Sequence, residues 1–190
     1  MTFEAYLDRA VRDAIARIPD AEVPGIYVVS LFVYDEDDDP RRPRVTVGYN
    51  TESEYEAAID DASDEHEARW NYAFWLQNEL VRVADSESDA DGAELRDAWV
   101  AEACPPGSYD EELDEFGGDS PVTQAFVALL VRLVVRLHAD GVIKAKFGRT
   151  IPVLIHELEY YDEIADQNLA ANPSTEALAD FAAWCRGERW

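Results

Sequence analysis

The sequence predicts a single α+β domain over residues 1–190, in which a small antiparallel sheet of two hairpins packs with about six or seven helices. Apolar residues recur at helical spacing near both ends of the chain. Runs of β-branched and aromatic residues occupy residues 26–49 and 142–158, and no linker-like stretch divides the sequence. Because 47% of the residues are hydrophobic, one core of ordinary size is available.

The first predicted elements are a helix and a hairpin. Residues 3–18 carry one apolar face, with Thr2 placed to cap the helix and Pro19 to end it. Residues 26–34 (IYVVSLFVY) are apolar on both faces, which is typical of a central strand, and residues 44–49 form its partner. The linking DEDDDPRRP is expected to be a long exposed loop because it is charged and rich in proline.

The middle of the chain is predicted to be helical. Capping patterns begin short helices after Thr51 and Asp64, and residues 70–83 are expected to continue as an aromatic-rich helix. A tryptophan stripe at helical spacing more often packs in a core than binds a ligand. Another helix follows Asp91, and residues 104–119 are expected to form a long acidic surface loop.

The most apolar predicted helix lies between Ser120 and Gly141, and the stripe through Arg132 and Arg136 should reach solvent or pair with acids. Its longest nearly apolar stretch is too short to span a bilayer, so no membrane segment is expected. Alternation over residues 142–147 and a run over 151–158 predict the second hairpin. Pro152 favours an edge strand, or one that enters the sheet after the proline. Two further helices are predicted towards the C-terminus, before and after an Asn-Pro break.

The net charge of −25 excludes some partners. Such a field repels nucleic acids and anionic membranes and attracts basic proteins. A composition with only two lysines is also typical of GC-rich genomes and of adaptation to high salt, so charge alone identifies no partner. The two cysteines form no disulfide framework and the N-terminus has no signal-peptide core, so a cytoplasmic location is expected.

No catalytic residue, cofactor site or metal site is predicted. The sequence has no phosphate-binding loop, dinucleotide fingerprint or serine elbow. His156 with Glu157 and Glu159 is the best local metal-like cluster, but on a strand the histidine points away from both acids and is expected to be partly exposed. His66 is expected at the surface near a helix start. His138 should complement the dipole of a helix C-terminus.

Several segments together resemble an uncharacterised bacterial family, the domain of unknown function numbered 4303. The similar segments are the N-terminal helix, YVVSLFVYD, VTVGYNTE, ARWNYAFW and the ending with Asn172-Pro173, Phe181 and Trp184. The resemblance implies an intracellular bacterial domain with no assigned activity. Such a domain is similar in size and style to the immunity proteins encoded beside polymorphic toxins. The resemblance implies no catalytic residues.

These observations predict a non-enzymatic, immunity-type interaction module for a basic partner such as a toxin. The residues expected to contact that partner are acids in two loops: Asp35, Glu36, Asp37, Asp38, Asp39, Asp110, Glu111, Glu112, Asp114 and Glu115. One alternative is an enzyme whose site combines the aromatic helix with scattered carboxylates, beginning with Trp70, Trp75 and Glu79. The other is an acidic mimic of DNA, which would need carboxylates spaced like phosphates along one surface.

Overall fold

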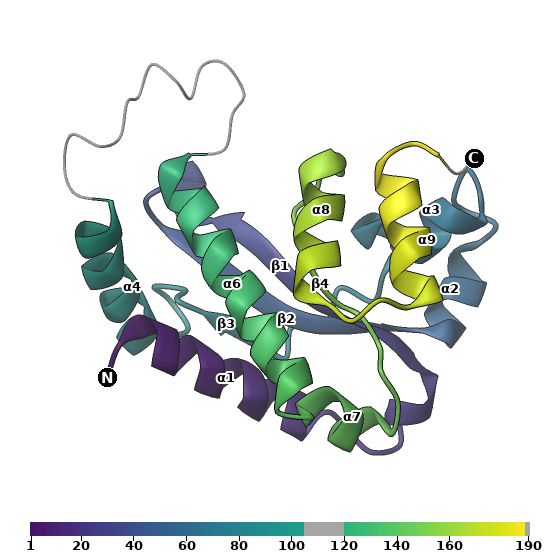
Figure 1. The fold of residues 1–190 in the computed structure, drawn as a ribbon, viewed down its shortest axis with the longest axis horizontal. Coiled ribbons are helices and arrows are strands. Elements are labelled where there is room, and N and C mark those ends of the chain that lie inside the picture. The colour runs from purple at the N-terminus through teal and green to yellow at the C-terminus, as the bar shows by residue number, and fades with distance from the viewer. Residues whose placement is uncertain (105–119, 189–190) are drawn as a thin grey trace.

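A four-stranded mixed sheet forms the centre of the computed structural model, which describes residues 1–104 and 120–188 (Figure 1). The strand order is β3-β2-β1-β4. Its strands are β1 (Ile26–Asp35), β2 (Pro43–Thr51), β3 (Val81–Val83) and β4 (Val153–His156). The β1–β2 and β2–β3 pairs are antiparallel, whereas β1 and β4 run parallel. The α+β class is confirmed, and the prediction of a purely antiparallel sheet is wrong.

The first hairpin is confirmed, and β1 is a central strand as its two-sided apolar run predicts. It pairs with β2 from end to end, with Leu31 opposite Val47 and Val33 opposite Val45. Val29, Leu31 and Val33 belong to the main core on one face, and Ser30 and Phe32 point to the other face.

The second hairpin does not form, because residues 142–147 fold as helix α7 (Val142–Phe147). Ile143 and Phe147 are its buried residues, four positions apart, so they also satisfy the spacing of a helical face. Gly141 adopts a φ of 74° between the preceding helix and α7. An alternation of six residues therefore fitted a strand and a helix equally well.

Strand β4 enters the sheet directly after Pro152 and lies at its edge, as the proline predicts. Two asparagines cover the open side of this strand. Asn168 lies in helix α8 (Asp162–Ala171), and Asn172 directly follows that helix. Asn168 bonds the backbone N–H and C=O of Ile155, and Asn172 bonds those of Val153. Their side-chain amides take the place of a fifth strand, which protects an otherwise bare edge.

The prediction of an aromatic helix over residues 70–83 is also wrong. Helix α3 (Glu65–Trp70) ends at Trp70, a short 3₁₀ turn covers Tyr72–Phe74, and β3 follows. Asn71 caps the 3₁₀ turn, and the side chain of Asn78 bonds both the N–H and the C=O of Tyr49 in β2. Such local side-chain bonds to the backbone compete with a helix.

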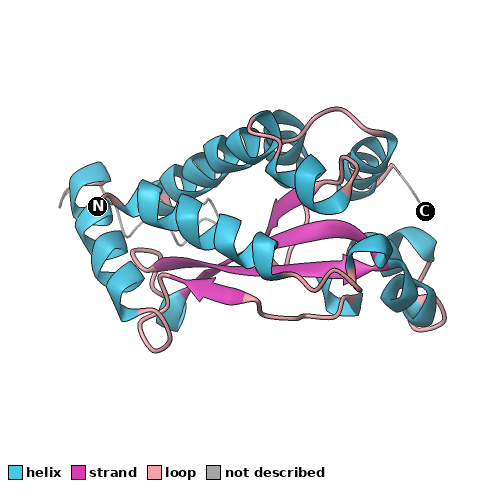
Figure 2. Ribbon diagram, turned by 90° about the horizontal axis from the view of Figure 1, so that it is seen from below, coloured by secondary structure: helices cyan, strands magenta, loops and turns pink. Residues whose placement is uncertain are grey.

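The described residues contain eight α-helices, one more than the upper end of the expected number, and they pack on both faces and around the ends of the sheet (Figure 2). Those not yet named are α1 (Phe3–Arg17), α2 (Glu52–Ala58), α4 (Ala90–Ala103), α6 (Pro121–Ala139) and α9 (Glu176–Cys185). The main core lies between the sheet and helices α1, α6 and α7. A second apolar cluster joins α3, α8 and α9 beside β4.

Helix α6 begins and ends as the sequence predicts. Ser120 caps it by accepting a hydrogen bond from the N–H of Thr123, and Arg136 pairs with acids of α1. By length and composition it is the one helix, among residues that the structure describes, that could cross a membrane, so the expectation of no such segment is not confirmed. Its buried face packs in the core, and core helices pass the same test.

Candidate functional site

The structure buries one of the acids expected to contact a partner. Glu36 is 7% exposed, and its carboxylate lies 2.8 Å from Arg42 and 3.2 Å from the fully buried Arg96. Burial alone would raise the pKa of Glu36. Hydrogen bonds from Ser86 and Arg96, with the charge of Arg42, outweigh that effect and lower the pKa. The expectation that Glu36 is exposed is therefore wrong, and this side chain holds the turn together.

Two neighbouring acids of the turn also bind arginines of the same chain. Asp37 pairs with Arg42 at 2.5 Å and Asp39 with Arg41 at 2.8 Å. Asp37 and Asp38 adopt left-handed φ angles of 57° and 56°, which aspartate tolerates better than most residues. The second predicted loop, with Asp110, Glu111, Glu112, Asp114 and Glu115, lies outside the described residues.

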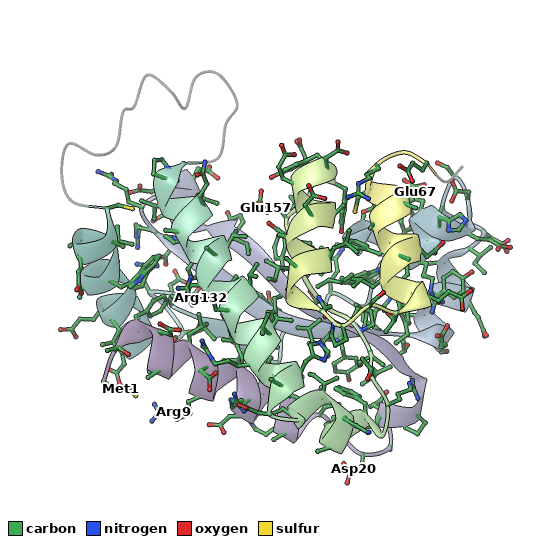
Figure 3. All side chains as sticks on the ribbon, in the orientation of Figure 1. Met1, Arg9, Asp20, Glu67, Arg132 and Glu157 are labelled. Atoms are coloured by element: carbon green, nitrogen blue, oxygen red, sulfur yellow. The ribbon has the colours of Figure 1, made fainter. Side chains whose placement is uncertain are left out.

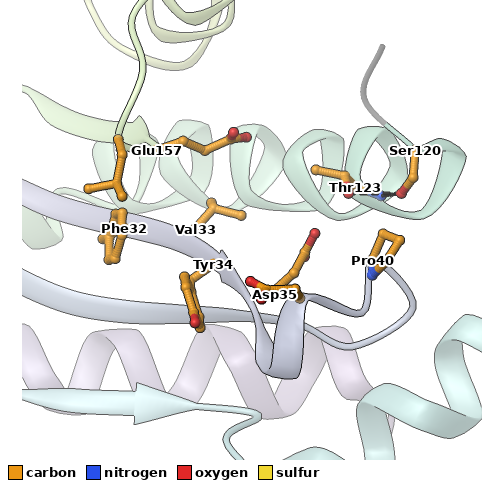
Figure 4. A pocket seen from close by; sticks show the side chains of 10 residues that line it. Phe32, Val33, Tyr34, Asp35, Pro40, Ser120, Thr123 and Glu157 are labelled. Atoms are coloured by element: carbon orange, nitrogen blue, oxygen red, sulfur yellow. Dashed lines mark hydrogen bonds between the residues drawn. The ribbon is translucent and has the colours of Figure 1, made fainter. Parts of the chain in front are cut away.

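A cavity of about 370 Å³ lies where β1 and β4 end, and we call it the edge cavity (Figure 4). Its walls come from the end of β1, the following turn, the first turn of α6 and the residues directly after β4. These residues are Phe32, Val33, Tyr34, Asp35, Asp38, Pro40, Ser120, Thr123, Glu157 and Leu158.

The sheet topology explains where the edge cavity lies. Strand β4 pairs with β1 only as far as His156, which lies opposite Phe32, so the last residues of β1 extend beyond β4. Glu157 approaches the cavity from the side of β4, Thr123 from α6, and Asp35 from the end of β1 (Figure 4). In parallel sheets, ligands bind in this position, outside the carboxyl ends of the strands and beside a helix N-terminus.

The polar groups of the edge cavity are mostly acceptors. Asp35, Asp38 and Glu157 contribute three carboxylates, and none of the ten lining residues is Lys, Arg or His. The buried hydroxyls of Ser120 and Thr123 bond one another at 2.8 Å. Glu157 lies between the ends of α6 and α8 as viewed in Figure 3. A negatively charged cavity of this kind favours a cation that also donates hydrogen bonds.

A second candidate is the hydrogen bond between Ser30 and His156. Nε2 of His156 lies 2.8 Å from Oγ of Ser30, and Nδ1 lies 3.1 Å from the carbonyl oxygen of Glu157. Because a carbonyl only accepts, we assign the proton to Nδ1, so Nε2 accepts the hydrogen bond that the serine hydroxyl donates. A serine nucleophile needs a base that accepts a hydrogen bond from its hydroxyl in this way.

Burial closes the Ser30–His156 pair to a substrate. His156 is 0% exposed and Ser30 is 2% exposed, so the expectation of a partly exposed histidine is wrong. The rings of Tyr72 and Trp75 lie 5.0 and 5.4 Å from the imidazole, measured between centroids. Burial lowers the pKa of His156 to about 4, which makes it a weak base near neutral pH. We therefore interpret this hydrogen bond as structural.

The other residues considered from the sequence lie away from the lining of the edge cavity. Trp70 is fully buried and Trp75 nearly so, whereas Glu79 pairs with Arg82 at 2.5 Å near β3. None of these residues lines the edge cavity. The two tryptophans of the alternative enzyme site are therefore core side chains.

The two remaining histidines have structural partners. Nδ1 of His66, which is partly exposed, lies 3.2 Å from Asp180, and this carboxylate also accepts a hydrogen bond from Trp70. His138, near the C-terminus of α6, donates to Asn172 at 3.0 Å, and its burial lowers its pKa. Among the residues described, no group of three His, Cys, Asp or Glu could hold a metal ion.

Comparisons with protein-family models, with curated proteins and with solved structures found no match to this chain. The fold and the edge cavity alone therefore define its class. It is an acidic α+β protein with a mixed four-stranded sheet and a carboxylate-lined cavity at the end of that sheet.

Proposed function

We propose that this protein is a non-enzymatic binding module for a basic protein partner, and that the edge cavity receives a cationic side chain of that partner. The observation that carries the proposal is the described lining of the cavity, in which three residues carry carboxylates and none is basic. The chain has 41 acids against 16 arginines and lysines, so its field also attracts a basic partner over a distance.

Arginine is the side chain that fits the edge cavity best. A magnesium or calcium ion needs several oxygens about 2.0–2.6 Å from one point. The carboxylates of Asp35, Asp38 and Glu157 are not among any metal-binding group in the described part of the chain. They approach from different walls, which suits a larger, planar cation with donors on several sides. A guanidinium has five such donors in a fixed arrangement.

The apolar walls support the same choice. Val33 and Pro40 line the cavity beside the carboxylates, and Leu158 in the same lining is 67% exposed. The three methylene groups of an arginine can pack on such surfaces while the guanidinium reaches the acids. An exposed leucine beside a charged cavity is also typical of a protein interface, where an apolar contact accompanies the charge pairs.

The resemblance to the family of unknown function numbered 4303 suggests the biological form of this proposal. An immunity-type protein in the cytoplasm would neutralise a basic toxin by covering its cationic surface. Charge pairs would speed the encounter, and the edge cavity would fix the register of the complex.

The proposal is tested by affinity capture from a lysate of the source organism, with the full chain as bait. We expect a basic protein to bind at about 0.1 M salt and to elute as salt rises, because exposed charge pairs are screened within about 10 Å at that concentration. The double variant Asp38→Asn, Glu157→Gln should lose the partner, since it removes two charges from the edge cavity.

The matched control is Asp60→Asn, Asp61→Asn, which removes the same charge from two exposed residues after α2. The control should retain the captured protein. Equal retention by both double variants, or a partner that is indifferent to salt, would contradict the proposal.

A further inference from the structure

A second cavity, of about 510 Å³, lies between the start of α1 and one side of α4. We call it the α1–α4 groove, and its residues used below are Phe3, Glu4, Leu95, Ala98, Trp99 and Glu102. It shares no residue with the edge cavity. Its floor is apolar and aromatic, and the charged side chains among its described lining residues are those of Glu4 and Glu102.

Helix α4 contributes a single helical face to the groove. Leu95, Ala98, Trp99 and Glu102 follow the spacing 3, 1, 3, so they lie side by side along the helix. This row is about 10 Å long, which corresponds to two helical turns. The buried Arg96 anchors α4 from another side, through its bond to Glu36. The groove face therefore takes no part in that anchor.

Trp99 packs against two aromatic rings at the floor of the groove. Its ring centroid lies 5.7 Å from that of Phe3 and 6.2 Å from that of Phe126, yet the side chain is only partly buried. Tryptophans that are fixed on one side and accessible on the other often dominate the binding energy of interfaces. Ala98 beside it is exposed and small, which leaves room for a side chain of a partner.

The charges of the groove select for a basic occupant. Glu102 is exposed near the end of α4, and Glu4 forms an ion pair with Arg136 at 2.9 Å. No Lys, Arg or His is among the described residues that line the groove. An apolar floor bordered by glutamates is complementary to a helix that has apolar residues on one face and a basic residue beside them.

We propose that the α1–α4 groove binds a short amphipathic helix of a partner protein, with an apolar side chain over Ala98 and Trp99 and a basic side chain at Glu102. This inference goes beyond the proposed function, because it concerns a different surface and does not depend on the edge cavity. Two helical turns of the partner match the length of the groove face.

The inference is tested with a fluorescent 14-residue peptide of leucine and lysine, patterned as an amphipathic helix, and with a scrambled peptide of the same composition. Binding to the full chain is followed by fluorescence anisotropy. The patterned peptide should bind more tightly than the scrambled one. Ala98→Gln should weaken its binding about tenfold, because the larger side chain fills the space beside Trp99.

Matched controls lie on the same helix. Ala101→Gln makes the same change at an exposed position outside the groove lining, and it should bind within about twofold of the wild type. Glu102→Gln should weaken binding more than Glu94→Gln, which removes the same charge from an exposed residue outside the lining. Glutamine is a good helix former, so these substitutions in α4 should preserve the helix.

The inference fails if the two peptides bind alike, if neither binds, or if Ala98→Gln and Ala101→Gln have the same affinity. The edge-cavity variant Asp38→Asn, Glu157→Gln should bind the patterned peptide as the wild type does. This last measurement separates the two surfaces, because loss of partner capture with intact peptide binding would support the proposed function and this inference independently.

Discussion

Replacing Asn172 with alanine should destabilise the protein more than the same change at Asn168. Both side chains cover the outer side of β4. Oδ1 of Asn172 accepts from the N–H of Val153 at 2.8 Å, and its Nδ2 donates to the C=O at 3.0 Å. The corresponding distances from Asn168 to Ile155 are 2.8 and 2.7 Å.

The remaining partners of these backbone groups decide the magnitudes. Asn172→Ala leaves both polar groups of the fully buried Val153 without their side-chain partner. Each orphaned group costs about 1–3 kcal/mol, so the expected loss is about 2–6 kcal/mol. Asn168→Ala orphans only the N–H of Ile155, because Nε2 of Gln167 still donates to the C=O at 2.9 Å. Its expected loss is about 1–3 kcal/mol.

Urea denaturation at pH 7, followed by tryptophan fluorescence, measures these losses. Gln167→Ala is the control, because the C=O of Ile155 then keeps Asn168, and it should cost less than about 1 kcal/mol. Equal or reversed losses at Asn168 and Asn172 would refute the argument that these amides replace a strand, as would losses below about 0.5 kcal/mol at both sites.

Two further predictions concern buried ionisable side chains. His156 is fully buried, and burial lowers its pKa to about 4, whereas the same histidine in the unfolded chain has a pKa near 6.5. The unfolded chain therefore binds more protons between these two pH values. Acidification from pH 6.5 towards 4 should lower the free energy of unfolding by up to about 3 kcal/mol. His156→Gln should flatten this part of the pH profile in urea unfolding, and parallel profiles would contradict it. Glu36→Gln should lower the free energy of unfolding by about 3–5 kcal/mol and Arg96→Met by less. The reason is that Glu36 keeps Arg42 when Arg96 is lost, whereas Arg96 would keep the exposed carboxylate of Asp97 and the carbonyl oxygen of Ala84. Equal losses in thermal melts would argue against this ordering.

The elements predicted correctly are those whose signals are local. The first hairpin follows from the apolar run over β1, and α6 follows from its cap at Ser120 and from Gly141. The prediction of a helix after Trp70 failed because the side chains of Asn71 and Asn78 bond backbone groups of nearby residues. A sequence window does not contain that tertiary context.

The edge cavity could be predicted only in part. Asp35 and Asp38 were predicted to contact a partner, and both line the edge cavity. Thr123 and Glu157 were not, because they reach the cavity only through the parallel pairing of β1 with β4. The prediction of a second hairpin excluded that pairing. The burial of Glu36 depends on Arg96, which is 60 residues away in sequence and carried no signal of its own.

The central claim is that the edge cavity binds an arginine side chain. Titration of the isotopically labelled full chain with N-acetyl-arginine-N-methylamide, followed by NMR, tests it most directly. We predict saturable shifts at Val33, Thr123 and Leu158, weaker binding of the lysine analogue, and about a tenfold loss of affinity in Glu157→Gln. Shifts elsewhere only, equal binding of the two analogues, or an unchanged affinity in Glu157→Gln would contradict the account.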